Sequence, residues 1–264
     1  MELTLNGSTR VYFVVGDPIA QVKSPEGMTA AFQAAGINGV CLPAHVAPDD
    51  LADWAAGIRK MKNADGLMVT VPHKIAFAGL CDEISDTARF LNTVNVVRFS
   101  ENGWHGEMFD GRAQVEALLK NGAVLQGKKA VQAGAGGAGT AIAHALVTAG
   151  VSELAIVETD VQRRDSLIER LNSLGRAKVY AGTSDPSGFD IVVNATPLGM
   201  KAGDPLPFDG DKLTAEMFVG DVVTYPDTAW ITKARAQGCR VSTGLDMYAA
   251  VRDLMADFLL QKAV

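Results

Sequence analysis

Short apolar runs alternate with amphipathic stretches along the first part of the chain, and this alternation predicts strands separated by helices. The expected strands cover residues 11–15, 39–46, 66–71 and 92–99, and the expected helices cover residues 26–35, 48–60 and a stretch that ends at residue 80. Because strands joined by helices pair in parallel, this part of the chain predicts an open, mostly parallel sheet.

The same alternation continues to the end of the chain. The expected strands cover residues 128–133, 154–157, 178–181, 190–194, 218–223 and 240–243, and the expected helices cover residues 114–120, 140–148, 162–174 and 247–262. We therefore expect an α/β protein of two domains. The predicted boundary lies near residue 110, although no low-complexity linker marks it.

The start of the first predicted helix has a simple structural interpretation. Pro25 suits the first helical turn, Ser24 precedes it as an N-cap, and Gly36 ends the helix. Ser24 therefore has a capping role open to it besides any role in binding a ligand.

Three glycines stand between a predicted strand and a predicted helix in the order G-x-G-x-x-G, at Gly134, Gly136 and Gly139. This pattern is typical of dinucleotide-binding turns: the first glycine allows a tight turn, the second lets backbone N–H groups reach a pyrophosphate, and the third lets the helix approach the sheet. Ala135 and Gly137 complete the loop, and the helix N-terminus favours an anion. Because the chain has 27 glycines, the pattern alone is also compatible with a purely structural turn.

An acidic residue ends the next predicted strand, where a dinucleotide-binding domain places an acid on the ribose. This residue is Glu158, and Asp160 adds a second carboxylate. Both favour NAD, because a 2′-phosphate there would meet like charges. Arg163 and Arg164 keep NADP open, and an acid at a helix start can also serve the helix dipole.

Composition and charge exclude several classes of protein. With 48% hydrophobic and 20% charged residues the chain has ample material for a core. A net charge of -6 argues against a nucleic-acid partner. The apolar run at residues 11–15 is far shorter than the span of about 20 residues that crosses a membrane, so we expect no membrane contact and a cytoplasmic location.

Cysteine and histidine positions predict no metal site. The three cysteines are far apart and odd in number, which favours neither a disulfide framework nor a CxxC site. The four histidines show no metal-ligand spacing.

Several short motifs follow one another in a fixed order over most of the chain. They are Gly16-Asp-Pro-Ile19, Lys23-Ser24-Pro25, Val69-Thr70-Val71-Pro72-x-Lys74, Val94-Asn95, Gly106, Asp110-Gly111, Gly134-Ala-Gly-Gly137, Asn194-Ala195-Thr196-Pro197-x-Gly199, Asp221, Tyr225-Pro226, Thr228 and Gly244-x-x-Met247. Together they resemble the shikimate/quinate dehydrogenase family. The resemblance implies a substrate domain at residues 1–110, a Rossmann NAD(P)-binding domain at 111–244, a cleft between them, and a C-terminal helix at 245–264 that packs back on the first domain.

The resemblance also implies a catalytic pair. In the family a lysine and an aspartate act together, and they correspond to Lys74 and Asp110 here. A lysine with an ordinary pKa of about 10.4 can take a hydroxyl proton if burial weakens its hold on its own proton while a carboxylate orients it. Without the motif, Lys74 would be an ordinary solvent-facing lysine that follows a strand.

The resemblance assigns further positions to substrate and cofactor. The substrate-binding positions are Ser24, Thr70, Asn95, Tyr225, Val22, Met68 and Val251, and the cofactor-binding positions are Gly134, Ala135, Gly136, Gly137, Gly139, Glu158, Asp160, Asn194, Thr196 and Gly244. Several of these residues are also compatible with a purely structural role. Thr70 is a residue type common in strands, Asn95 one common in turns, and Tyr225 could pack in a core.

The sequence departs from the family pattern at polar positions. Val22 replaces a serine, Met68 an asparagine, Met108-Phe109 an asparagine and a threonine, and Val251 a glutamine. Since an unpartnered buried hydroxyl costs about 1–3 kcal/mol, we expect shikimate to be a poor substrate and the natural one to be a related cyclic or small hydroxy acid with fewer hydroxyls.

Neighbouring side chains offer an alternative to that expectation. Gln21, His73 or Tyr248 could replace the lost hydrogen bonds. The cofactor pattern also departs from the family, because NADP-preferring relatives typically show N-R-T where this chain has Glu158-Thr159-Asp160.

The sequence therefore predicts an NAD(P)-dependent oxidoreductase that interconverts a hydroxyl and a ketone on a shikimate- or quinate-like cyclic hydroxy acid. The expected partner is this small molecule, with a homodimer left open. The rival is a catalytically silent nucleotide-binding sensor or partner protein on the same fold. Retention of both Lys74 and Asp110 favours the enzyme, and motifs in both halves disfavour a Rossmann transferase or a folate-type dehydrogenase.

Overall fold

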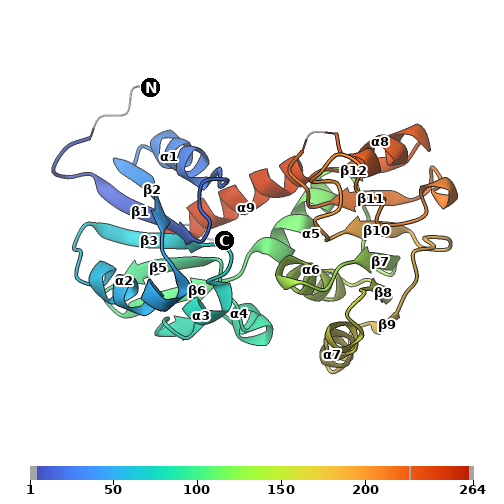
Figure 1. Ribbon diagram of the computed structural model, residues 1–264, viewed down its shortest axis with the longest axis horizontal. Coiled ribbons are helices and arrows are strands. Elements are labelled where there is room, and N and C mark those ends of the chain that lie inside the picture. The colour runs from blue at the N-terminus through green and yellow to red at the C-terminus, as the bar shows by residue number, and fades with distance from the viewer. Residues whose placement is uncertain (1–4, 226, 262–264) are drawn as a thin grey trace. The chain divides into compact units, whose positions relative to one another are not determined.

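The computed structural model describes residues 5–225 and 227–261. They fall into two compact units, one built from the described residues up to Phe109 and from Arg252 onward, and one built from those between Asp110 and Val251. Each unit contains a six-stranded sheet with helices packed on it (Figure 1). That these units act as a substrate domain and a nucleotide domain stays a prediction.

The first unit is built on a mixed sheet with the strand order β2-β1-β3-β5-β6-β4. Its elements are β1 (Arg10–Gly16), α1 (Ser24–Ala34), β2 (Gly39–His45), the 3₁₀ turn η1 (Pro48–Asp50), α2 (Leu51–Ile58), β3 (Ala64–Val69), α3 (Lys74–Ala78), β4 (Glu83–Ile84), α4 (Asp86–Leu91), β5 (Val96–Ser100) and β6 (Gly103–Glu107). β1 pairs in parallel with β2 and β3, and β4 in parallel with β6. β5 runs antiparallel to β3, and it also runs antiparallel to β6, to which a tight turn joins it directly.

Two expectations for the first unit were wrong. Ser24 is not an N-cap: Lys23 already has helical dihedrals, so the helix begins at Ser24, and no side chain caps it. The strand expected at residues 92–99 begins only at Val96, because α4 precedes it and Asn92 ends that helix in the left-handed conformation with φ 53°. The sequence did not predict α4, β4 or β6.

The second unit is built on an all-parallel sheet with the strand order β12-β11-β10-β7-β8-β9. Its elements are α5 (Asp110–Lys120), β7 (Lys129–Ala133), α6 (Gly137–Thr148), β8 (Glu153–Val157), α7 (Val161–Asn172), β9 (Lys178–Ala181), β10 (Ile191–Asn194), the 3₁₀ turn η2 (Gly210–Lys212), β11 (Phe218–Asp221), α8 (Ala229–Ala236), β12 (Arg240–Ser242) and α9 (Gly244–Leu259), whose last part belongs to the first unit. This is the strand order of the Rossmann fold, and it confirms the predicted α/β class. The sequence did not predict α8.

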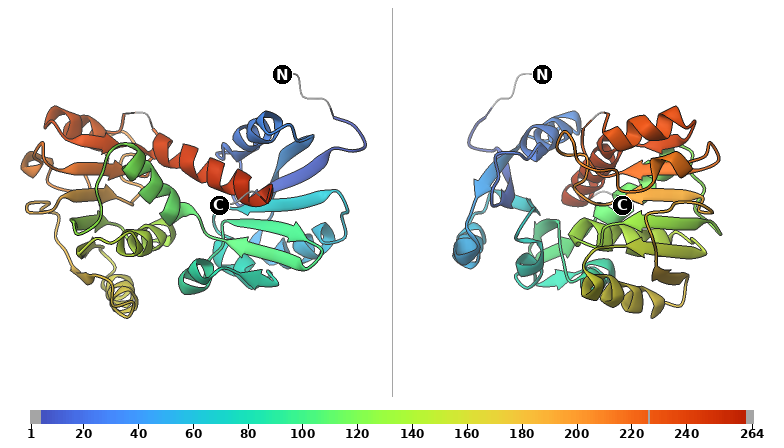
Figure 2. Two further views of the ribbon diagram at one scale, coloured as in Figure 1. Left: turned by 180° about the vertical axis from the view of Figure 1, so that it is seen from behind. Right: turned by 45° about the vertical axis from the view of Figure 1, so that its right-hand side comes forward.

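Helices lie on both faces of the second sheet (Figure 2). On one face Val131, Val192 and Val219 join a buried cluster with Trp230 and Ile231 of α8. On the other face the sheet packs against α5 and α6. Among the described residues, no helix has both the length and the apolar character needed to cross a membrane.

Candidate functional site

The glycine-rich loop between β7 and α6 is packed tightly at both ends and open at its tip. Gly134 has φ 96°, and a Cβ there would lie 2.6 Å from the Ala195 carbonyl oxygen. A Cβ at Gly139 would lie 2.4 Å from the Gly134 carbonyl oxygen, whereas a Cβ at Gly136 or Gly137 would meet no heavy atom within 4 Å. Packing therefore requires the outer glycines, and the open backbone between them fits a pyrophosphate.

The side chain of Gln132 on β7 stabilises this loop by hydrogen bonds. Its side chain is fully buried, and its Nε2 donates to the carbonyl oxygens of Gly134 (2.8 Å) and Gly139 (2.7 Å). Gln132 was not among the predicted site residues, although a polar residue inside an apolar strand just before the glycines was a usable signal.

Glu158 follows β8, and its carboxylate lies against the glycine-rich loop. Oε2 accepts the Ala135 N–H at 2.9 Å, and Oε1 accepts the N–H groups of Thr159 (2.8 Å) and Asp160 (3.1 Å). Burial works to raise the pKa of Glu158, but the hydrogen bonds from Ala135, Asp160 and Thr159 outweigh it and hold the pKa below its usual value. The end of β8 therefore carries a fixed negative charge at neutral pH.

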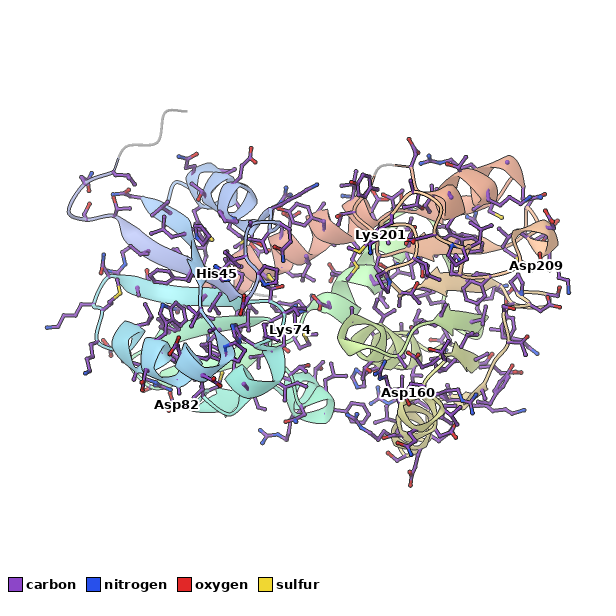
Figure 3. The ribbon with its side chains drawn as sticks, in the orientation of Figure 1. His45, Lys74, Asp82, Asp160, Lys201 and Asp209 are labelled. Atoms are coloured by element: carbon purple, nitrogen blue, oxygen red, sulfur yellow. The ribbon has the colours of Figure 1, made fainter. Side chains whose placement is uncertain are left out.

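Asp160 and Arg163 lie beside this carboxylate at the start of α7. Asp160, labelled in Figure 3, caps the helix by accepting the Arg163 N–H at 3.0 Å. The Arg163 guanidinium lies 3.7 Å from Glu158 Oε2 and 3.4 Å from Asp160 Oδ2. The two predicted acids thus share one arginine as their counter-ion.

Asn194 and Thr196 bond to each other in the loop after β10. Asn194 Oδ1 accepts the Thr196 N–H (3.0 Å) and hydroxyl (2.6 Å), and its Nδ2 donates to Leu198 O and to Asp221 Oδ1, both at 3.0 Å. Thr228 donates its hydroxyl to Asp221 Oδ2 at 2.7 Å. Direct contact of Asn194 and Thr196 with a cofactor stays a prediction, and the structure supports a role in shaping this loop.

Asp221 is the buried acid of that network, and no role was predicted for it from the sequence. Burial raises the pKa of its carboxyl above the usual value, against the hydrogen bonds from Thr228, Val223 and Asn194. The signal was present, because Asp221 ends an apolar strand inside a recognised motif.

The ends of β7, β8 and β10 bring Gly134, Glu158 and Asn194 to one edge of the second sheet. β7 and β10 are neighbours from which the chain winds outward in opposite directions, and nucleotides bind at such a point. Gly244 begins α9, where a Cβ would lie 2.2 Å from the Val223 carbonyl oxygen. Close packing therefore explains Gly244, and its contact with a cofactor stays a prediction.

In the first unit, the ends of β1 and β3 meet the start of β5 at one sheet edge. The Thr70 N–H donates to Val15 O at 2.9 Å, and the Val69 N–H donates to Asn95 O at 2.8 Å. This edge therefore brings Thr70 and Asn95 together, as the predicted substrate site requires.

Lys74 begins α3 beside the same edge (Figure 3). Its carbonyl oxygen accepts the Val94 N–H at 3.0 Å, and the Asn95 Oδ1 accepts the N–H of Phe109 at 3.0 Å. Hydrogen bonds thus tie together the segments that carry Lys74, Asn95 and the residue before Asp110. Asp110 itself begins α5 and is 9% exposed. The acid–base role of Lys74 and Asp110 stays a prediction.

Two of the side chains that offered replacement hydrogen bonds are already engaged in the protein. His73 is buried, and its Nε2 donates to the Val46 carbonyl oxygen at 2.8 Å, so it holds the α3 start to the end of β2. Gln21 donates its Nε2 to Pro18 O at 2.9 Å.

The apolar replacements lie in different surroundings. Met68, Met108 and Phe109 are all buried, and the Phe109 ring makes an edge contact with Phe258 at 5.7 Å between centroids. Val22 and Val251 are partly buried.

Two of the polar positions predicted to bind substrate differ in exposure. Ser24 is partly buried in the first turn of α1, whereas Tyr225 is 61% exposed and is therefore not a core residue in this structure.

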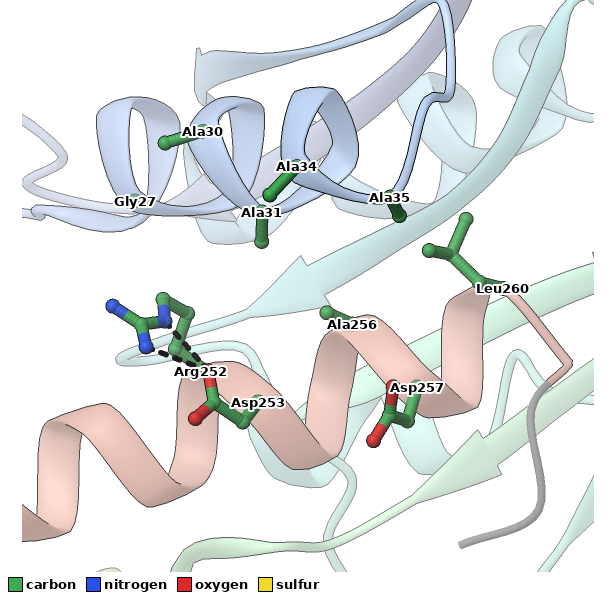
Figure 4. Close-up of a pocket in the computed structure, with 10 residues that line it drawn as sticks. All are labelled: Gly27, Ala30, Ala31, Ala34, Ala35, Arg252, Asp253, Ala256, Asp257 and Leu260. Carbon is green, nitrogen blue, oxygen red and sulfur yellow. Dashed lines mark hydrogen bonds and ion pairs between the residues drawn. The ribbon is translucent and has the colours of Figure 1, made fainter.

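A hollow of about 570 Å³ lies elsewhere, between α1 and the end of α9 (Figure 4). Small α1 side chains and the Arg252, Asp253 and Asp257 side chains line it, and none of the predicted site residues does. Within residues 5–225 and 227–261, no group of three or more His, Cys, Asp and Glu side chains could hold a metal ion.

Comparisons with known proteins agree with the motifs. The family model of the shikimate dehydrogenase substrate binding domain matches residues 14–97. A shikimate dehydrogenase (NADP(+)) of Rubrobacter xylanophilus is 38% identical over 247 residues, which cover 91% of this chain and 87% of that protein.

Solved structures extend the likeness to the whole fold. Shikimate 5-dehydrogenase of Listeria monocytogenes, in complex with shikimate and NAD, has a TM-score of 0.93 and 28% identity, covering 100% of this chain and 96% of that chain. Ligand-free 5-ketofructose reductase of Gluconobacter sp. strain CHM43 has a TM-score of 0.89 and 29% identity, covering 97% and 94%. The resemblance drawn from the motifs is confirmed: the chain belongs to the shikimate dehydrogenase family and is an NAD(P)-dependent oxidoreductase.

Proposed function

We propose that this enzyme interconverts a hydroxyl and a ketone on a small cyclic or sugar-like substrate, with Lys74 and Asp110 as its acid–base pair and NAD as its preferred cofactor. The observation that carries the proposal is a backbone hydrogen bond, from the Val94 N–H to the Lys74 carbonyl oxygen, which joins the Lys74 and Asn95 segments at the edge that also holds Thr70. The backbone contact supports the proposal that this edge presents a proton-transfer group together with hydrogen-bonding side chains.

The bound nicotinamide would supply hydride chemistry at the reacting carbon. The protein's own side chains must then move the proton to and from the substrate oxygen. In oxidation, neutral Lys74 takes the hydroxyl proton on its Nζ, and in reduction the ammonium form returns it. Asp110 supplies a carboxylate that orients the lysine, and Asn95 supplies an amide for a substrate hydroxyl.

The preference for NAD rests on the charge at the end of β8. Hydrogen bonds hold Glu158 ionised, and Asp160 places a second carboxylate beside it. A ribose hydroxyl can donate to such a carboxylate, whereas a 2′-phosphate is repelled by it.

The substrate is the part of the proposal in which this chain differs most from the family pattern. Val22 and Met68 stand where the family has polar side chains, and His73 and Gln21 are engaged within the protein. We therefore propose a substrate with fewer hydroxyl contacts than shikimate. A neutral ketose is a second candidate, because the loss of a serine at Val22 weakens recognition of a carboxylate and a similar structure is a 5-ketofructose reductase.

A single screen tests these assignments. Shikimate, quinate, smaller hydroxy acids and fructose are offered with NAD or NADP, 5-ketofructose is offered with each reduced cofactor, and nicotinamide absorbance is followed. We expect turnover with NAD(H) to exceed that with NADP(H) for the best substrate. Nucleotide binding with no turnover of any compound would support the silent nucleotide-binding alternative instead.

A further inference from the structure

His73 directly precedes Lys74 and is bonded through both its backbone and its side chain. Its N–H donates to the Thr70 carbonyl oxygen at 2.9 Å, and its own carbonyl oxygen accepts the Phe77 N–H at 2.8 Å. The residue is 1% exposed, and its Nε2 donates to the Val46 carbonyl oxygen at 2.8 Å. Because a carbonyl oxygen only accepts, this bond requires a proton on Nε2.

The acceptor of this bond belongs to a closely packed part of the sheet edge. Val46 directly follows β2, is buried, and donates its N–H to the Gly16 carbonyl oxygen at the end of β1, at 3.3 Å. A Cβ at Gly16 would lie 2.4 Å from the Thr70 side chain, so the end of β1 packs against the segment that follows β3. The His73 ring is thus bonded to a part of the structure with little room to move.

The helix that begins with the lysine depends on such contacts for its position. α3 covers only Lys74–Ala78, and a helix this short is not stable on its own. Phe77 is fully buried in the middle of α3, and the Lys74 carbonyl oxygen accepts the Val94 N–H at 3.0 Å. The His73 ring adds a contact at the turn that leads into the helix. Without it, α3 can rotate about the Phe77 contact, and the Lys74 side chain moves with the helix.

We propose that His73 is a positioning residue whose hydrogen bond to Val46 holds Lys74 where it exchanges a proton with the substrate oxygen. The buried ring donates its N–H within the protein, so it acts through the lysine and not on the substrate. A misplacement of about 1 Å can cost a hundredfold in rate, so loss of this bond lowers turnover even though the lysine is still present. This inference rests on the proposed acid–base role of Lys74 and extends it to the residue that orients it.

Two substitutions separate the hydrogen bond from the volume of the ring. His73→Phe keeps a ring and removes the donor, whereas His73→Gln keeps an N–H at a similar distance from the backbone. The substrate is shikimate, or the compound that the screen shows to turn over fastest, with NAD. We expect His73→Phe to lower kcat by about tenfold or more, with KM and the affinity for ADP-ribose within about twofold of wild type. His73→Gln should keep kcat within about threefold of wild type.

A double-mutant cycle tests whether His73 acts through Lys74. In the Lys74→Ala background, His73→Phe should change kcat by less than about twofold, because the side chain that it positions is gone. Its effect on the melting temperature should persist there, because the buried Val46 carbonyl oxygen still loses its partner. His105→Phe is the control: this histidine of the same unit pairs with the exposed Glu83 at 3.0 Å, and its loss should leave kcat unchanged.

The outcomes separate this inference from the proposed function. A lower melting temperature with unchanged kcat in His73→Phe, or an equal loss of kcat in both backgrounds, overturns the role of His73 alone. A His73→Gln variant as slow as His73→Phe also overturns it, because the hydrogen bond is then not the cause. If His73→Phe does not fold, the smaller His73→Leu takes its place, and failure of both to fold shows a purely structural role and overturns the inference. Near-normal turnover of Lys74→Ala overturns the proposed function and the inference with it.

Discussion

At Lys74 the backbone and the side chain have separate tasks. The carbonyl oxygen accepts the Val94 N–H, and this bond survives a change of side chain. We expect Lys74→Ala and Asp110→Asn each to lower kcat by about 100-fold or more, the scale of a lost acid or base, with melting temperature and nucleotide affinity nearly unchanged. Lys62→Ala, at an exposed lysine of the same unit, is the control. Near-normal turnover in both test variants would contradict the assignment.

Glu158 predicts a dependence of stability on pH. Since hydrogen bonds hold its pKa below the ordinary 4.5, its ionised form stabilises the fold above that pH, and this contribution is lost as the pH falls through the lower folded value. The melting temperature of Glu158→Gln should therefore lie furthest below wild type at neutral pH, and the difference should shrink below about pH 4.5. A difference independent of pH would show that the charge of Glu158 contributes nothing, and Glu101→Gln at an exposed turn serves as a comparison.

In the loop between β7 and α6, different glycines are expected to serve packing and ligand binding, so substitutions can test the two roles separately. A Cβ at Gly139 would lie 2.4 Å from a backbone oxygen, whereas a Cβ at Gly136 meets no atom within 4 Å, at a φ of -70° that alanine adopts readily. We expect Gly139→Ala to lower the melting temperature by several degrees. Gly136→Ala should keep the melting temperature and weaken ADP-ribose binding about tenfold or more, by keeping the pyrophosphate from the backbone. Equal effects of the two variants on stability would contradict this division.

The accuracy of the predicted elements follows the strength of their patterns. β9 was predicted to the residue, and β8 and α7 to within a few residues, because apolar periodicity marks them. β6 was missed since its sequence, with glycines at both Gly103 and Gly106, has weak strand character. Long-range contacts stabilise it: Trp104 stacks on Phe99 at 4.3 Å between centroids, under the Arg59 guanidinium at 4.0 Å. A prediction made from a short stretch of sequence cannot include such contacts.

Across the whole chain, the motifs identified the candidate residues but not which of their polar atoms are already engaged. The structure brings Thr70, Asn95 and the Lys74 backbone to one edge, and their roles in binding and catalysis stay predictions. It also places His73 in a structural hydrogen bond and Asn194 in a buried network with Asp221. These facts depend on residues that are far apart in sequence, so one sequence could not supply them.

The last prediction concerns the substrate, to which the whole first unit contributes. Val22, partly buried just before α1, replaces a serine of the family pattern, and Met68 replaces an asparagine inside β3. If two hydrogen bonds to shikimate are lost from the transition state, kcat/KM falls by about a hundredfold, since each ~1.4 kcal/mol is a factor of ten. We expect kcat/KM for shikimate to lie below about 10⁴ M⁻¹s⁻¹.

A restoring substitution makes this prediction specific. Val22→Ser should raise kcat/KM for shikimate by about tenfold, because a hydroxyl that hydrogen-bonds a carboxylate stabilises the complex by about 1.5 kcal/mol or more. Val124→Ser, at an exposed valine of the second unit, should leave it unchanged. A wild-type kcat/KM for shikimate at or above about 10⁴ M⁻¹s⁻¹, with no gain in Val22→Ser, would show that other side chains already replace the lost contacts and that the pocket retains the family's substrate.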